Sequence, residues 1–194
     1  ETTLRAALRM IEVPAAVMGR WIEWDKSTKT DIQPQSDSSS ETRLVDVREL
    51  VLRNAMAPTA LVRRSVILEL GGYDQWAGGA EDRDMWIRIA SRHRILLIDT
   101  YLYKYRLHMT SLSHNPDRQH RVTRFVLAKA KTNPEIALPW WVWRESCAVQ
   151  EYQSAMNYSM AGRYSRALCH VILSIYNWPM LGTHYEPSFP FLAR

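Results

Sequence analysis

The chain has 194 residues, 46% of them hydrophobic, which is enough for one buried core. Its formal net charge of +5 suits acidic partners such as nucleoside diphosphates, anionic glycans or anionic lipid surfaces. The basic residues are scattered, and the sequence has no cysteine-rich finger, RNP-like motif or dense Lys/Arg block, so nucleic acid is not expected as a partner.

The chain as a whole also carries information about its compartment. No apolar run approaches the length of a membrane span and no signal peptide is visible. Cys147 and Cys169 fall on successive predicted helices, offset along the axis by about 13 Å at 1.5 Å per residue, which argues against a disulfide between them. We therefore expect a reduced, soluble protein of the cytoplasm, at most attached to the inner face of the membrane.

The first elements alternate between regular structure and polar loop. Residues 3–12 have the pattern of a helix, and residues 15–24 that of a strand. Residues 26–42 are polar, Ser-rich and poor in apolar side chains, which predicts a flexible surface loop. A short helix near residues 45–53 then leads into Pro58 and a strand at residues 59–63.

The most informative stretch of the sequence runs from residue 62 to residue 113. It predicts a short strand, a helix, a Gly-Gly-Tyr-Asp turn at residues 71–74, a glycine-rich loop, an acidic-headed amphipathic helix and two strands. The acidic-headed helix begins at Glu81 and Asp82 and carries apolar residues at helical spacing, so it should bury Trp86 and Ile89. Its acidic end then faces the loop that contains Gly78 and Gly79.

Two interpretations of Glu81 and Asp82 are open from the residues alone. Either carboxylate can cap the helix by accepting backbone N–H bonds, a position that the helix dipole favours. Alternatively, the two preceding glycines make a mobile loop that closes over a bound molecule beside a catalytic carboxylate. In that interpretation Asp84 is a solvated helix residue.

Several landmarks of this stretch occur in a telling order: GGYD at residues 71–74, the pair Glu81-Asp82, Trp86 and Arg88 of EDRDMWIR, and YRLHMTSLS at residues 105–113. Together they resemble the second half of the nucleotide-sugar-binding (GT-A) fold of family 2 glycosyltransferases. The resemblance covers about the first 115 residues. It implies an α/β fold class, with a partial GT-A fold and mixed sheet over residues 1–115 and an α-helical extension over residues 116–194.

The resemblance also implies an activity and a base. Family members transfer a sugar from a nucleotide-sugar donor to a hydroxyl with inversion, here of a glycan or lipid-linked acceptor as in polysaccharide biosynthesis. Such a reaction needs a base within hydrogen-bond reach of the attacking oxygen. The Asp of the family's ED pair maps onto Asp82, with Glu81 beside it as an acceptor-side group. Further substrate contacts are expected from the loop and the helix, at Trp76, Gly78, Gly79 and Trp86.

The resemblance further implies a metal-dependent diphosphate site. Similar enzymes use the His of the YRLH segment as a ligand of Mn²⁺ or Mg²⁺, which maps onto His108. Arg106, Ser111 and Ser113 are the phosphate-side candidates. A single His near a strand end is more often an ordinary surface or core residue, and one nitrogen ligand does not make a metal site.

One part of the family pattern is missing. No Asp-x-Asp motif, whose carboxylates would hold the cation on the diphosphate, precedes Asp82. We therefore expect a C-terminal fragment of a larger glycosyltransferase, inactive alone and self-associating through a sheet edge that the missing half would cover. A non-catalytic interaction module derived from such an enzyme is the alternative.

The last third of the chain predicts helices. Residues 116–131 form a basic amphipathic helix, followed by Trp140, Trp141 and Trp143. These indoles either make a peripheral membrane contact together with the basic helix or pack as core. Residues 146–178 predict an αα-hairpin that turns near Gly162 and resembles a single tetratricopeptide unit. Its apolar stripe should pack on the preceding helices or on a partner chain.

Overall fold

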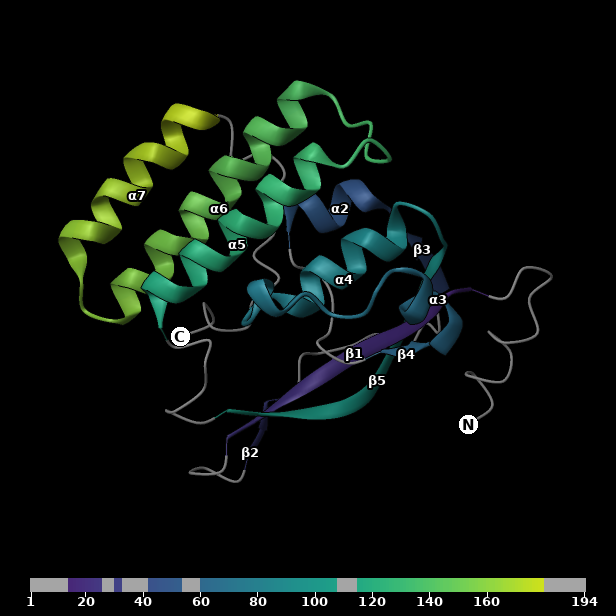
Figure 1. The fold of residues 1–194 in the computed structure, drawn as a ribbon. Helices are drawn as coiled ribbons and strands as arrows, with labels where there is room; N and C mark the ends of the chain where they lie inside the picture. Colours follow the sequence, from purple (N-terminus) through teal and green to yellow (C-terminus); the bar gives the residue numbers. More distant parts are fainter. Residues whose placement is uncertain (1–13, 26–29, 33–41, 54–59, 108–114, 180–194) are drawn as a thin grey trace.

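The computed structural model describes residues 14–25, 30–32, 42–53, 60–107 and 115–179 (Figure 1). It is an α/β structure in which a narrow mixed sheet lies on one side and the long helices on the other, as the fold class predicted in outline. The predicted helix at residues 3–12 lies outside the described residues.

The sheet is built around two long strands. β1 (Ala16–Asp25) runs parallel to β5 (Ile95–Leu107), with register shifts around Arg20. β3 (Thr42–Val45) pairs antiparallel with β5, whereas β2 (Thr30–Ile32) and β4 (Leu61–Val62) pair antiparallel with β1. The strand order is β2-β1-β5-β3, with β4 off this path.

Two sequence expectations about strands were wrong. One continuous strand, β5, replaces the two predicted at its position, because residues 95–107 contain no Gly or Pro to interrupt it. The polar segment at residues 26–42 was expected to be loop throughout. Its residues 30–32 instead pair with the end of β1, where backbone hydrogen bonding does not depend on apolar side chains.

Short helices connect the sheet to the helical layer. α2 (Val47–Leu52) is capped by Asp46, whose side chain accepts a hydrogen bond from the backbone N–H of Arg48. α3 (Arg64–Glu69) ends in the Gly71-Gly72 turn, where both glycines have positive φ. The 3₁₀ helix η1 (Gln75–Ala77) then leads to α4 (Glu81–Ala90).

Helix α4 lies at the centre of the core. It is drawn between the long strands and α5 in Figure 1, and buried side chains cover most of its circumference. One continuous cluster joins sheet and helices: Ala16, Met18 and Ile95 from the sheet, Met85, Trp86 and Ile89 from α4, and Val126 and Trp143 from the helical layer. The helical layer therefore shares a single core with the α/β part.

Three long helices complete the described chain: α5 (Pro116–Thr132), α6 (Trp140–Met160) and α7 (Tyr164–Asn177). α6 and α7 form the expected hairpin, which turns at Gly162 with φ of +71°. α7 meets α6 through small residues, since Ala167 and Ser174 are buried and the Ser174 hydroxyl donates to the carbonyl oxygen of Ala148. Cys147 and Cys169 are free thiols, as predicted.

The outer face of α7 is apolar and exposed. Its exposed residues include Leu168, Val171, Ile172, Ile175 and Tyr176. The predicted stripe therefore does not pack on the preceding helices within the described chain. None of the helices in the described ranges is both long and apolar enough to cross a membrane.

The three neighbouring tryptophans have different environments. Trp143 is buried in the core, as one of the two interpretations predicted. The guanidinium of Arg48 lies over the Trp141 ring, 4.8 Å from its centroid. Trp140 is 69% exposed, so this part of the aromatic patch is open to solvent.

A buried arginine holds α2 against α4. Arg83 Nε donates to the carbonyl oxygen of Leu50 at 3.0 Å and Nη2 donates to that of Val51 at 2.9 Å. The Ser146 hydroxyl of α6 donates to the same Val51 oxygen at 2.6 Å. These bonds satisfy carbonyls at the end of α2 that have no partner within the helix. Burial lowers the pKa of Arg83 to about 10, so the side chain stays charged at neutral pH.

Replacing Arg83 by Met should lower the free energy of unfolding by roughly 2 to 4 kcal/mol, because buried carbonyls lose their donors while side-chain volume is kept. Urea denaturation followed by circular dichroism measures this loss. Arg64→Met, at an exposed position of α3, is the matched control and should change stability little. Equal stability of the two variants would contradict the role assigned to Arg83.

Candidate functional site

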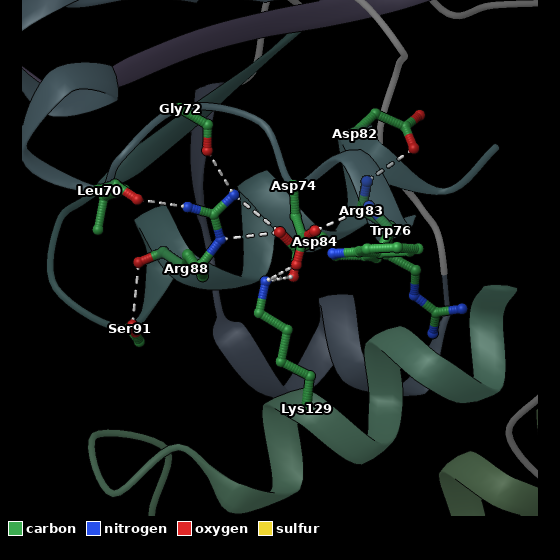
Figure 2. A network of polar contacts seen from close by, with 10 residues as sticks. All are labelled: Leu70, Gly72, Asp74, Trp76, Asp82, Arg83, Asp84, Arg88, Ser91 and Lys129. Atoms are coloured by element: carbon green, nitrogen blue, oxygen red, sulfur yellow. Dashed lines mark hydrogen bonds and ion pairs between the residues drawn. The ribbon is translucent and has the colours of Figure 1, made fainter. Parts of the chain in front are cut away.

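The candidate site is the loop between η1 and α4 together with the first turn of α4 (Figure 2). Asp74 begins the loop by capping η1, since its Oδ1 accepts from the backbone N–H of Trp76 at 2.8 Å. Trp76 itself is 75% exposed. Gly79 has φ of +105°, a conformation that favours glycine, and it turns the chain into α4.

Helix α5 holds this loop in place. Arg118 Nη2 donates to the Gly78 carbonyl oxygen, and Gln119 Nε2 donates to that of Gly79, each at 3.2 Å. The Gly79 N–H in turn donates to the carboxylate of Glu81. The loop was expected to be mobile, but in this structure side chains of α5 tie both of its glycines.

The two carboxylates at the start of α4 have different surroundings. Ala80 is the N-cap residue and makes no side-chain capping bond, so neither Glu81 nor Asp82 occupies that position. Glu81 is exposed and bonds the loop. Asp82 is half-buried, and its Oδ1 accepts from the Arg83 backbone N–H at 2.7 Å. Desolvation raises the pKa of Asp82 above its usual range, and the charge of Glu81 adds to this effect.

Asp84 belongs to the interior of the protein. It was expected to be a solvated helix residue, which is wrong: it is 3% exposed and accepts from Arg88 Nε at 2.8 Å. Lys129 Nζ lies 2.9 Å from its other oxygen and also donates to Asp74 Oδ2 at 2.7 Å. A carboxylate at this depth needs such partners, because an unpaired buried charge is very costly.

Arg88 extends this network to the Gly-Gly turn (Figure 2). Its Nη1 donates to the carbonyl oxygen of Leu70 at 2.8 Å, and its Nη2 donates to that of Gly72 at 2.9 Å. The landmarks GGYD and EDRDMWIR are therefore one structural unit. Asp84, Arg88 and Lys129 hold the turn and the loop in place, and Asp82 lies next to them in the first turn of α4.

The remaining predicted site residues lie elsewhere. Trp86 is only 1% exposed, so its ring is not accessible as a substrate contact. Among the described residues its indole Nε1 has no hydrogen-bond partner. The large apolar ring follows the stripe on the inner face of α4, and core packing explains its position. Arg106 lies on β5, and only its backbone is described. His108, Ser111 and Ser113 lie outside the described residues.

Sequence reasoning missed a second cluster, in the helical layer. His120 of α5, Glu151 of α6 and His170 of α7 come together there. Each residue is isolated in the sequence and belongs to a different helix, so no local spacing signals the cluster. Only the packing of α5, α6 and α7 reveals it.

The chain was compared with known protein families, characterised proteins and solved structures, and nothing matches. An open depression of the surface is lined by Asp117 and residues 162–166 at the α6–α7 turn. Asp82 does not line that depression, so a substrate bound at Asp82 would need contacts from other residues.

Asp84→Asn should lower the free energy of unfolding, because it breaks a buried ion pair, a change that costs roughly 3 to 5 kcal/mol. The loss should lie near the lower end of that range, since Lys129 is partly solvated. Chemical denaturation at neutral pH measures the loss. Glu135→Gln, which removes an exposed carboxylate paired with Arg92, is the control and should matter far less. If Asp84→Asn is as stable as the wild type, the network does not hold the site.

Asp82→Asn should leave the protein at least as stable as the wild type at pH 7. Because the pKa of Asp82 is higher in the folded protein than in the unfolded chain, ionisation of Asp82 lowers the free energy of unfolding. This loss is absent below the pKa of the unfolded chain and develops as the pH rises from there through the pKa of the folded protein. The stability advantage of the Asn variant should therefore shrink when both proteins are compared at about pH 3, below the ordinary Asp pKa. A variant less stable than the wild type at pH 7 would show a structural role for the carboxylate.

Proposed function

We propose that this chain provides the acceptor side of an inverting glycosyltransferase of the GT-A type, acting on a nucleoside-diphosphate sugar and a hydroxyl of a glycan or lipid-linked acceptor. The observation that carries the proposal is the environment of Asp82. It is a half-buried carboxylate with a raised pKa, beside a glycine-containing loop and next to Arg83 and Asp84, which are buried and hydrogen-bonded. Perturbed carboxylates of this kind are common at catalytic sites.

The chemistry uses Asp82 as the general base. The acceptor hydroxyl attacks the anomeric carbon, the bond from that carbon to the diphosphate oxygen breaks, and the hydroxyl proton passes to Asp82. A raised pKa strengthens the Asp82 carboxylate as a base. The Arg83 backbone N–H donates to Asp82 Oδ1 at 2.7 Å and so helps to orient the carboxylate.

Trp76 and the glycines complete the acceptor side in this proposal. The exposed indole at the loop offers a flat apolar face against which a sugar ring can stack. Gly78 and Gly79 keep the loop backbone free of side chains next to Glu81 and Asp82. Arg118 and Gln119 fix the position of that backbone, so the acceptor meets a preformed surface.

The donor side would be shared with residues outside this chain. Arg106, Ser111 and Ser113 are the proposed diphosphate contacts, and His108 the proposed ligand of Mn²⁺ or Mg²⁺. Hard cations on diphosphates also require carboxylates, which an Asp-x-Asp motif would provide. The sequence upstream of Asp82 contains none, so in this proposal the chain alone binds nucleotide weakly and does not catalyse.

A non-catalytic interaction module is the second candidate. The exposed apolar face of α7 favours it, because contiguous apolar surface commonly marks an interaction site. Exposed Trp140, close in sequence to the basic helix α5, would similarly suit a peripheral contact with an anionic membrane. Either contact is also compatible with an enzyme that elongates lipid-linked glycans.

The test uses this chain joined to a nucleotide-binding half that contains an Asp-x-Asp motif. Asp82→Asn should preserve nucleotide-sugar binding, measured by calorimetry, and lower turnover by about two to four orders of magnitude, the usual contribution of a positioned base. Turnover is measured by release of the nucleoside diphosphate.

Asp46→Asn is the matched control, because Asn caps α2 as well as Asp does and the change lies away from the loop. It should retain wild-type turnover. Turnover of Asp82→Asn within twofold of the wild type would exclude Asp82 as the base. Absence of both nucleotide-sugar binding and transfer in the joined protein would favour the interaction module.

A further inference from the structure

A polar cluster in the helical layer has no part in the proposed sugar chemistry. His120 of α5, Glu151 of α6 and His170 of α7 each offer one nitrogen or carboxylate oxygen, and these atoms lie within 4.8 Å of one another. Glu151 is buried, and both histidines are partly buried. The three helices lie side by side in Figure 1, with α7 on the outer edge.

The hydrogen bonds around His120 determine its tautomer. The Ser154 hydroxyl donates its single hydrogen to the Gln150 carbonyl oxygen at 2.9 Å. The contact of 2.9 Å between Ser154 Oγ and His120 Nδ1 must then have the imidazole as donor. The proton of neutral His120 is thus on Nδ1, and the lone pair on Nε2 is available. Metal-binding histidines are commonly oriented in this way, with the other ring nitrogen bonded to a neighbouring oxygen.

The surroundings of His170 fix its ring as well. The Tyr158 ring stacks on it, with centroids 4.9 Å apart and planes 7° from parallel. The His120 ring lies 4.7 Å away on centroid distance. The Tyr158 hydroxyl donates to Asp117 Oδ1 at 2.8 Å, which anchors the stacking ring to α5. Both imidazoles are therefore positioned before any ligand binds.

Glu151 makes the cluster suited to a cation. Its Oε2 lies 2.5 Å from His170 Nδ1, and its burial makes a compensating positive charge necessary. In the structure described, His170 Nδ1 is the hydrogen-bond partner of this carboxylate. A divalent cation would meet the need for positive charge more fully, since it would bind the carboxylate and both imidazoles at once. Two imidazoles and a carboxylate are a ligand set typical of Zn²⁺.

We propose that His120, Glu151 and His170 form a Zn²⁺ site that fastens α7 to α5 and α6. Zinc bonds of about 2.0–2.2 Å place tetrahedral ligand atoms roughly 3.3 Å apart. On zinc binding, the distance between His170 Nδ1 and Glu151 Oε2 would therefore lengthen from 2.5 Å. Ligand atoms that lie farther apart, at up to 4.8 Å, would move closer together. Water occupies the fourth position, as is usual when a protein provides three ligands.

The site has a structural purpose in α7. This helix contributes small residues such as Ala167 and Ser174 to its interface with α6 and leaves its large apolar residues exposed. Burial of small side chains stabilises the interface only modestly, since stabilisation scales with apolar area. A metal ligated from three helices adds a cross-link where apolar contact is thin. This role is independent of the chemistry proposed at Asp82.

Zinc titration of the metal-stripped chain tests the proposal. Calorimetry should show one Zn²⁺ bound per chain, and zinc at about 100 times the dissociation constant should raise the melting temperature by roughly 5–10 °C. Cobalt(II) in place of zinc should give the visible absorption of a tetrahedral site without a thiolate charge-transfer band. Absence of binding by the wild-type chain would overturn the proposal whatever the variants do.

Variants identify the ligands. His120→Gln and His170→Gln should each weaken zinc binding by about 100-fold or more and abolish the thermal shift, with wild-type helical signal in the absence of metal. His93→Gln, which alters the remote His93–Glu69 pair, should bind as the wild type does. A Cys147→Ser, Cys169→Ser double variant should also retain binding. Wild-type zinc affinity in His120→Gln or in His170→Gln, or loss of binding in the double cysteine variant, would refute this ligand set.

Discussion

The position of the candidate site depends on one buried carboxylate. Asp84 is enclosed by Arg88 of its own helix and by Lys129 of α5, and Lys129 also binds Asp74 at the start of the loop. Because a buried carboxylate is tolerated only with its partners in place, α4, α5 and the loop must keep one relative arrangement. Arg88 extends the same requirement to the carbonyls of the Gly-Gly turn.

The first turn of α4 directs neighbouring side chains to different parts of the protein. Successive helical residues point about 100° apart, so adjacent positions face different surroundings. Glu81 bonds the loop, Asp82 accepts from the Arg83 backbone N–H, and the Arg83 side chain reaches the carbonyls at the end of α2. The buried contacts of Arg83 and Asp84 therefore hold in place the helical turn that carries Asp82, the proposed base.

Local patterns in the sequence predicted much of the fold and part of the site. The apolar spacing of residues 81–90 and the turn at Gly162 both indicated what the structure contains, because each depends on neighbours in the chain. Burial of Asp84 could not be predicted in this way. Its main partner outside α4, Lys129, is distant in sequence, and a charged residue on an amphipathic helix ordinarily faces water. The cluster of His120, Glu151 and His170 was hidden for the same reason, since each residue comes from a different helix.

The alternation of roles along α4 affects how mutational data on this protein would be interpreted. Asp82 and Asp84 are the same amino acid, two positions apart, and under the proposed function loss of either would lower output in a screen that scores product alone. Loss of Asp82 would remove the proposed base, whereas loss of Asp84 would reduce the amount of folded protein. A scan that records cellular abundance together with product would separate the two effects residue by residue.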